Sequence, residues 1–271
     1  MPTAQLTDRA VLAVSGPDAA ALLQGLVTSS LTRLTAATPV YAALLTPQGK
    51  VQADFVLFSD GAGGFLVDVA AAGADDLLKH LKLYRLRAAV ALDPRPDLHV
   101  FASWETGAPA HPGDAAPDTP PLDPRLPALG RRWIAAAAGT DADLAAYTLH
   151  RLALGVPDTA DVLGEFLLDA NFEELNGVDF KKGCFVGQEV TARMKHKAQP
   201  RRRIVPLTVE GDVRRGARLT DANGLEIGEV TSSAGGNALA SIRLDRLREA
   251  GMLIAGDKPA ALRPAAYALP I

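Results

Sequence analysis

The stretch Asn176-Gly-Val-Asp-Phe-Lys-Lys-Gly-Cys-Phe-Val-Gly-Gln-Glu-Val-Thr-Ala-Arg193 differs in composition from the rest of the chain. From residue 181 to residue 203 the sequence holds eight Lys and Arg residues and one acid, Glu189, so this segment has a local charge of +7. The whole chain of 271 residues has a formal net charge of −3, which leaves −10 on the other residues. The nearly neutral total therefore conceals a strongly basic segment.

The only cysteine of the chain, Cys184, lies within this stretch. One sulfur cannot form an intramolecular disulfide, a CxxC redox pair or a four-thiolate zinc or iron–sulfur site. Any thiol chemistry must therefore be carried out by Cys184 alone or shared with a second molecule.

The residues around Cys184 indicate a tight loop that leads into a helix. Gly183 and Gly187 flank the cysteine and permit a close approach of the backbone to whatever occupies the site. The run from Gln188 to Lys195 is compatible with a helix, so Cys184 is expected just before a helix N-terminus, where free N–H groups stabilise an anion. The two lysines that precede the loop act in the same direction. Together these features favour a reactive thiolate.

Plainer interpretations of the same features remain open. A lone cysteine beside Phe185 and Val186 is commonly an inert buried residue, and a basic run is commonly a solvated face. A functional basic segment would instead hold an acidic ligand, such as a polyglutamate tail, or an acidic protein partner. RNA phosphates would also suit the charge, but few aromatic residues lie nearby to stack on bases.

Length and composition bound the class of protein. At roughly 150 residues per domain, a chain of 271 residues suggests two domains or three small ones. The apolar stretches are all shorter than the roughly 18 residues that a membrane-spanning helix requires. The first residues match neither a signal peptide nor an Arg-rich and Ser-rich transit peptide. These observations predict a protein of the cytoplasm.

The N-terminal third is expected to form a small α+β unit. Short apolar runs between turn residues predict strands at 9–15, 40–46, 51–59, 65–70, 88–92 and 99–104. Apolar residues at helical spacing predict helices at 19–27 and 74–86.

The remainder of the chain divides into three parts. From Gly107 to Gly130, seven of the 19 prolines fall within 24 residues, which predicts an exposed loop or a partly disordered linker. A helix is expected from Asp141 to Leu154. Beyond Ile204, short β runs separated by glycines predict a small separate barrel.

The eight residues from Lys182 to Glu189, KGCFVGQE, resemble the KGC[YF]xGQE signature of the YgfZ family. Members of that family are folate-binding relatives of the glycine-cleavage T-protein, an aminomethyltransferase. The resemblance extends over nearly the whole chain, and its other elements are Leu23 to Thr28 (LQGxxT), Leu45 to Asp54 (strand–turn–strand), Asp123 to Gly130 (DPRLxxLG) and Arg151 to Pro157 (RxxxGxP).

The resemblance implies an α+β fold, with three domains in a ring of the aminomethyltransferase type around a central channel that binds tetrahydrofolate. The implied parts are a split folate-binding domain (1–46 and 120–200), a ferredoxin-like subdomain (47–106), a Pro-rich loop (107–119) and a C-terminal β-barrel (201–271).

The resemblance also implies which residues bind folate. Tyr41 and Asp54 match a channel tyrosine and an aspartate that contact folate in the aminomethyltransferases. Asp169 and Asn171 lie on the family's P-x-E-A-N element, where Leu167 replaces the proline and Asp169 replaces the longer glutamate.

Two departures separate the chain from the T-proteins themselves. Those transferases have F-x-G-[KR]-E where this sequence has Cys184 and Gln188. They also have a pair of aspartates, of which the first is Ala53 here. Both departures favour the YgfZ family.

The resemblance thus implies a tetrahydrofolate-binding factor for the assembly, maintenance or repair of iron–sulfur enzymes. Its transient thiolate would act by a mixed disulfide, by persulfide capture or by shared ligation. The implied active motif consists of Lys182, Gly183, Cys184, Gly187, Gln188 and Glu189. Partners would be folate and iron–sulfur client enzymes, including the radical-SAM type, or cluster carriers. We expect a monomer with no stably bound metal or cluster, and neither a membrane nor a nucleic acid is a favoured partner.

Two alternatives stay open. The first is a tetrahydrofolate-dependent aminomethyl or methyl transferase in which Asp54 positions the folate nitrogen. The second is an adaptor that binds RNA or protein through residues 181–203.

Overall fold

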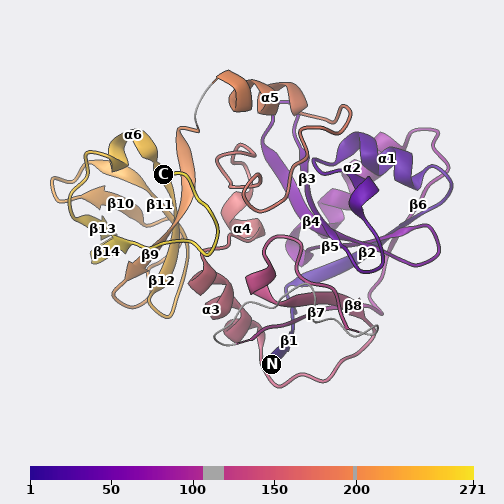
Figure 1. The fold of residues 1–271 in the computed structure, drawn as a ribbon, viewed down its shortest axis with the longest axis horizontal. Helices are drawn as coiled ribbons and strands as arrows, with labels where there is room; N and C mark the ends of the chain where they lie inside the picture. Colours follow the sequence, from indigo (N-terminus) through magenta and orange to yellow (C-terminus); the bar gives the residue numbers. More distant parts are fainter. Residues whose placement is uncertain (106–118, 198–199) are drawn as a thin grey trace.

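The computed structural model describes residues 1–105, 119–197 and 200–271. Within these residues the strands form a five-stranded sheet, a three-stranded sheet and a closed barrel. Figure 1 shows the barrel on one side of the molecule and the five-stranded sheet on the other, with the three-stranded sheet near the N-terminus and the short helix α4 (Thr159–Val162) between them. The predicted α+β fold with a C-terminal β-barrel is confirmed.

The five-stranded sheet is antiparallel and has the order β3-β4-β5-β2-β6. Its strands are β2 (Arg9–Ser15), β3 (Val40–Leu45), β4 (Val51–Ser59), β5 (Phe65–Ala70) and β6 (Ala91–Pro94). One face packs on α1 (Ala19–Leu26) and α2 (Ala74–Arg85), and the other packs on residues from the second half of the chain. Successive side chains of a strand point to opposite faces of the sheet, and both faces of this sheet are covered. All six residues of β3 are therefore buried.

The three-stranded sheet joins segments that are far apart in the sequence. It has the order β1-β7-β8, with β1 (Thr3–Gln5), β7 (His99–Ser103) and β8 (Arg131–Ala135). Helix α3 (Leu144–Leu154) packs on it through Tyr147, whose ring lies edge-on to that of Trp104 at 5.7 Å. The Asp143 side chain caps α3 by accepting from Ala146 N at 2.8 Å, and Gly155, with φ +74°, ends the helix.

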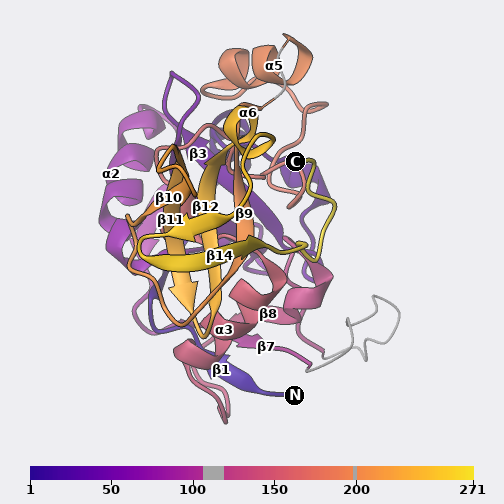
Figure 2. The same cartoon turned by 90° about the vertical axis from the view of Figure 1, so that its left-hand side faces the viewer.

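The barrel comprises β9 (Arg202–Val209), β10 (Arg218–Asp221), β11 (Glu226–Ala234), β12 (Asn237–Arg243), β13 (Leu253–Ala255) and β14 (Lys258–Leu262), in the spatial order β10-β11-β12-β9-β14-β13. The short helix α6 (Leu244–Leu247) follows β12, and aliphatic side chains fill the interior. Figure 2, viewed from the barrel side, shows α5 (Gln188–Lys197) at the opposite end of the molecule from the N-terminus. Single 3-10 turns occur at Leu31–Arg33, Ala71–Gly73 and Pro127–Leu129.

The predicted division between residues 46 and 47 does not agree with the sheet. It would separate β3 from β4, which pair along their length with Val40 opposite Leu57 and Ala43 opposite Asp54. The predicted α+β unit also loses its last strand, because β7 pairs with β1 and β8 instead. The prediction grouped strands that follow one another in the sequence. The hydrogen bonds of the three-stranded sheet instead join strands from distant parts of the chain.

The predicted exposed loop or linker, 107–130, lies partly outside the described residues, and so does all of the implied Pro-rich loop (107–119) except its last residue. The described part, 119–130, is not an exposed linker. Asp123 N donates to Gly130 O at 2.8 Å, and Asp123 forms a buried ion pair with Arg125 at 2.8 Å. Gly130 lies so close to β7 that a Cβ there would be 2.1 Å from Ser103 O. This part of the segment therefore belongs to the core despite its proline content.

A buried ion-pair network joins the two sheets. Asp68 of β5 accepts from Arg9 Nε of β2 and from Arg132 Nε of β8, both at 2.6 Å, and all three side chains are buried. Burial raises the pKa of the Asp68 carboxyl, but Arg132 and Arg9 together outweigh this effect and hold the pKa below its ordinary value. Arg132 also lies 3.6 Å from Asp123 and donates to Tyr147 Oη at 3.3 Å.

We predict that Asp68→Asn lowers the free energy of unfolding by about 3 kcal/mol or more, because it leaves two buried guanidinium groups short of a counter-charge. Asp97→Asn is the matched control, since the Asp97–Arg95 pair is exposed and is expected to contribute little to the free energy of unfolding. Urea denaturation of the two variants measures both effects. Equal effects of the two substitutions would contradict the prediction.

Candidate functional site

The predicted reactive cysteine lies on an exposed loop in front of α5. Cys184 is exposed, whereas the adjacent Phe185 is buried. Helix α5 begins at Gln188, as predicted, and the Gln188 side chain accepts a hydrogen bond from Phe185 N at 3.3 Å. Glu189 pairs with Arg193 at 2.8 Å on the exposed side of the helix. Cys184 is therefore not a buried residue, and its reactivity stays a prediction.

The loop is held against the turn between β3 and β4. Gly187 has φ +79°, and a Cβ there would lie 2.7 Å from Thr46 O. On the facing turn, Gly49 has φ +80°, and a Cβ there would lie 2.9 Å from the Val190 side chain. Two glycines from distant motifs thus let the two backbones touch. The close approach expected at Gly183 is not found, since a Cβ there would meet no atom of the described residues within 4 Å.

Lys182 binds backbone carbonyls rather than the thiol. Its Nζ donates to Gln24 O at 2.7 Å, to Val27 O and to Ser29 O at 3.3 Å, at the C-terminal end of α1. These three acceptors use all three N–H donors of the ammonium group. Burial lowers the pKa of Lys182 to about 8, with Asp179 opposing the shift. The Lys182 ammonium group is thus attached to carbonyls at and just after the end of α1, and the predicted effect of its charge on the Cys184 thiolate stays a prediction.

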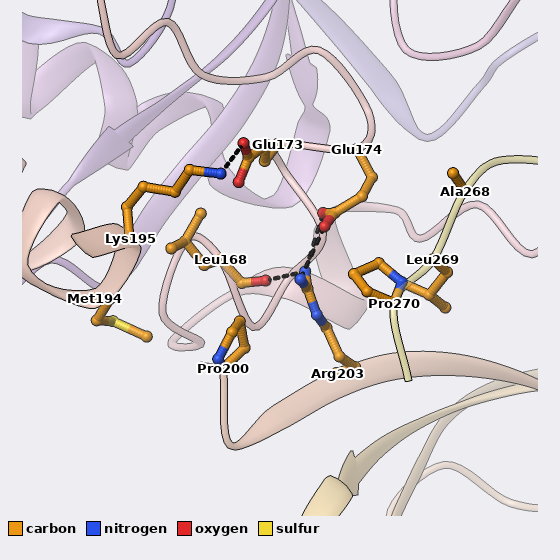
Figure 3. Close-up of a pocket in the computed structure, with 10 residues that line it drawn as sticks. All are labelled: Leu168, Glu173, Glu174, Met194, Lys195, Pro200, Arg203, Ala268, Leu269 and Pro270. Atoms are coloured by element: carbon orange, nitrogen blue, oxygen red, sulfur yellow. Dashed lines mark hydrogen bonds and ion pairs between the residues drawn. The ribbon is translucent and has the colours of Figure 1, made fainter. Parts of the chain in front are cut away.

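Two charges of the basic segment 181–203, those of Lys195 and Arg203, are paired with acids that precede the segment. Figure 3 shows Lys195 with Glu173, and Arg203 with Glu174 at 2.8 Å, on the wall of a cavity of about 610 Å³. Arg203 also donates to Leu168 O at 2.6 Å. Since each cation in the lining of this cavity has an acid beside it, the cavity offers little attraction for an acidic ligand or for RNA.

Tyr41 and Asp54 are in direct contact inside the body. Tyr41 Oη donates to Asp54 Oδ2 at 3.0 Å, and Thr159 Oγ1 donates to Asp54 Oδ1 at 2.6 Å. Asp54 is 2% exposed, so it is not a solvent-facing strand acid. Burial raises the pKa of Asp54, although Arg9 opposes the shift. Asp54 lines a cavity of about 520 Å³.

The lining of this cavity includes residues that sequence reasoning missed. Arg9 Nη1 donates to Thr159 Oγ1 at 3.2 Å, and Arg151 lies 3.7 Å from Asp158 and 3.2 Å from Asp161. Thr159 lies within a capping box in which the Asp158 and Asp161 side chains accept from each other's backbone N–H groups. The spacing of these two aspartates was a usable signal in the sequence, and Arg151 opens the RxxxGxP element. Neither signal indicated that the side chains of Arg151, Asp158 and Thr159 would lie around the same cavity as Asp54.

Asp169 and Asn171 lie at the junction with the barrel. Asp169 O accepts from Ile204 N at 3.3 Å, and Asn171 Nδ2 donates to Ile204 O at 2.7 Å and to Tyr267 Oη at 3.1 Å. Burial raises the pKa of Asp169 to about 6, and Glu165 adds to the shift. The buried Oδ1 atoms of Asp169 and Asn171 have no hydrogen-bond partner among the described residues.

Tyr41 connects these two polar regions. Its ring stacks on Phe172, the residue after Asn171, at a centroid distance of 4.9 Å. The structure therefore brings Tyr41 and Asp54 together and places Asn171 one residue from the stacked pair. Asp169 is not among the residues that line the Asp54 cavity.

Two further properties concern only the described ranges 1–105, 119–197 and 200–271. No helix in them is long and apolar enough to cross a membrane. They also contain no group of three or more His, Cys, Asp or Glu side chains that could hold a metal ion.

The folded chain has the architecture of an aminomethyltransferase with a C-terminal barrel. Residues 5–100 match the GCVT N-terminal domain, and residues 201–268 match the C-terminal β-barrel domain of CAF17. The crystal structure of glycine cleavage system aminomethyltransferase T from Bartonella henselae superposes with a TM-score of 0.71, covering 96% of this chain and 83% of that one. The identity of the two sequences is 18%, so this likeness concerns the fold alone.

Curated relatives define the family. Iron-sulfur cluster assembly factor IBA57, mitochondrial, of Mus musculus is 32% identical over 90% of this chain and 78% of its own length. IBA57 homologs of Neurospora crassa and Mycosarcoma maydis are 36% and 37% identical over 74% and 76% of this chain. The chain belongs to the IBA57 family of iron–sulfur cluster assembly factors. It spans about half the length of the two fungal relatives, 52% and 56%.

The family corrects one sequence-based expectation and refines another. The prediction of a cytoplasmic protein is contradicted, because the mouse and fungal relatives are named as mitochondrial proteins. The expected resemblance holds at the level of a GCVT-like protein with a CAF17-type barrel.

We predict that Asp169→Asn changes stability in a pH-dependent manner. The pKa of Asp169, about 6 in the native state, lies above its ordinary value, so ionisation destabilises the fold as pH rises from about 4 to 6. Asn does not ionise. The free energy of unfolding of the variant relative to the wild type should therefore rise by about 2 kcal/mol between pH 4 and pH 7.5. Urea denaturation across this range tests the prediction, and a difference that does not vary with pH would refute it.

Proposed function

We propose that the chain is an iron–sulfur cluster assembly factor in which Cys184 is the reactive group. The observation that carries the proposal is the position of the only cysteine, which is exposed between two anchored stretches of backbone. The name shared by the mouse and fungal relatives supports the cellular role.

A single thiolate limits the chemistry that Cys184 can perform. One sulfur supplies one of the several ligands that a cluster needs, so a cluster at this site would be completed by thiolates of a carrier or client protein. On ligation the thiol loses its proton to solvent. An exposed sulfur suits such transient, shared ligation because a second protein can approach it. As a narrower form of the proposal, we assign the chain a role like that of the YgfZ proteins, with clients that include radical-SAM enzymes.

We expect Cys184→Ala to abolish this role while leaving the fold intact, because the exposed side chain contributes little to packing. In cells that lack their own IBA57, the variant should restore the activity of iron–sulfur enzymes at least about tenfold less than the wild type does. Cys184→Ser should fail in the same way. Ala192→Ser, a change of similar size on α5, is the matched control. Full restoration of activity by Cys184→Ala would remove the thiol from the function.

We further propose that tetrahydrofolate binds beside Tyr41 and Asp54. The test of fit is whether buried acceptors exist for the N–H groups of a reduced pterin ring. The buried Asp54 carboxyl borders a cavity of about 520 Å³, and Asp158 supplies a second carboxylate to the lining of the same cavity. These residues fit the group.

In this proposal Asp54 orients the ring, and Tyr41 and Thr159 hold the Asp54 carboxyl by their hydroxyl donors. Bound tetrahydrofolate would supply nitrogens that carry one-carbon units. Among the described residues, the basic segment 181–203 contributes none to the lining of this cavity, so in this proposal the glutamate tail is not assigned to that segment.

Calorimetric titration with tetrahydrofolate tests the binding proposal. We expect Asp54→Asn to weaken binding about tenfold or more, since it removes the charged acceptor from a buried site. Asp97→Asn, at an exposed ion pair, should bind like the wild type. Thermal melting controls for folding of each variant. Absence of binding to the wild type, or equal affinity of the Asp54 variant, would overturn the proposal.

A further inference from the structure

Lys182 joins two motifs that are distant in the sequence. It lies two residues before Cys184, yet its Nζ donates to the carbonyl of Gln24 in the last turn of α1 and to those of Val27 and Ser29, which follow the helix. The last carbonyls of a helix have no partners within the helix, and they lie at its negative end. An ammonium group is therefore well suited to this position. Because all its N–H donors are in use, Lys182 has none left for the thiol.

Additional hydrogen bonds hold the chain in front of Lys182 along the same segment. Thr28 Oγ1 donates to Gly177 O at 2.6 Å, and Asp179 N donates to Thr28 O at 3.0 Å. Ser29 Oγ donates to Asn176 O at 3.4 Å. Lys182 is the last anchor of this contact before the exposed loop.

A second anchor follows the cysteine. Phe185 is 6% exposed and packs in the core, and Gly187 lies against the backbone of Thr46. Between the two anchors only Gly183 and Cys184 remain exposed. Two residues are too few to fold back into the protein when both flanking side chains point inward. The outward position of the thiol is therefore a consequence of the anchors on either side.

We infer that Lys182 is a positioning residue, which fixes the loop on the α1 carbonyls and so presents the Cys184 thiol to a partner protein. The inference rests on the proposed function of Cys184. It differs from activation of the thiol, because the Lys182 charge is directed to the carbonyls. A loop released from α1 would keep its thiol, but the thiol would lose its defined position.

The first test is chemical rescue of the anchor. Lys182→Ala removes Cγ, Cδ, Cε and Nζ, which are the atoms that propylammonium supplies. Amide hydrogen exchange of residues 183–187 should become about tenfold faster in the variant and should slow again when propylammonium is added. Lys181→Ala, at the exposed neighbouring lysine, should show neither effect. Unchanged exchange in Lys182→Ala would overturn the inference. If Lys182→Ala does not fold, Lys182→Met, which keeps an apolar stem, takes its place, with exchange alone as the readout.

The second test separates positioning from activation. Cys184 is the only thiol, so iodoacetamide alkylation reports on it alone. The pH midpoint of alkylation should be the same in the wild type and in Lys182→Ala, while support of iron–sulfur enzyme activity falls about tenfold in the variant. A midpoint that rises by a full pH unit with unchanged exchange would mean that Lys182 acts on the thiol directly. Full support of iron–sulfur enzyme activity by Cys184→Ala would refute the proposed function. The hydrogen-exchange result would still decide whether Lys182 anchors the loop.

Discussion

The buried carboxylate of Asp68, held between Arg9 and Arg132, is the interaction on which the body of the protein depends. It joins the five-stranded sheet to the three-stranded sheet, which consists of strands from three distant parts of the chain. Buried charges are costly unless each finds a partner, so the surrounding residues must also be paired. The Asp123–Arg125 pair meets this need on the side of Arg132. The network therefore ties the relative position of the two sheets to the pairing of these buried charges.

The same network extends to the cavity beside Asp54. Arg9 contacts both Asp68 and Thr159, and Thr159 donates to Asp54. From there Arg151 and Asp161 continue the chain of contacts to Ser232 of the barrel. The position of Asp54 is thus set by contacts that cross the whole molecule. This arrangement suits a binding site, because a rigid polar group needs no rearrangement when it meets a ligand.

The exposed thiol and the buried cavity are built in opposite ways. Asp54 lies in the interior with its carboxyl held by two hydroxyl groups, whereas Cys184 is exposed and depends on backbone anchors on both sides. Both regions use the β3–β4 hairpin, since Asp54 lies on β4 and Gly49 lies in the turn that Gly187 contacts. The β3–β4 hairpin therefore fixes the position of the Cys184 loop relative to the Asp54 cavity.

The sequence by itself determined the features that depend on local pattern. Short apolar runs between turn residues predicted strands such as β2 and β4, and short β runs separated by glycines predicted the barrel. Helix-compatible residues predicted that α5 begins at Gln188. The motif around Cys184 indicated the right class of protein. Only the tertiary structure decided which charged side chains pair with each other, because the partners lie far apart in the sequence. Glu173 and Glu174 pair with Lys195 and Arg203 of the basic segment, whose charges the sequence analysis treated as available to a ligand or partner. Lys182 binds α1, some 155 residues away, because its buried ammonium group must find acceptors wherever the fold provides them.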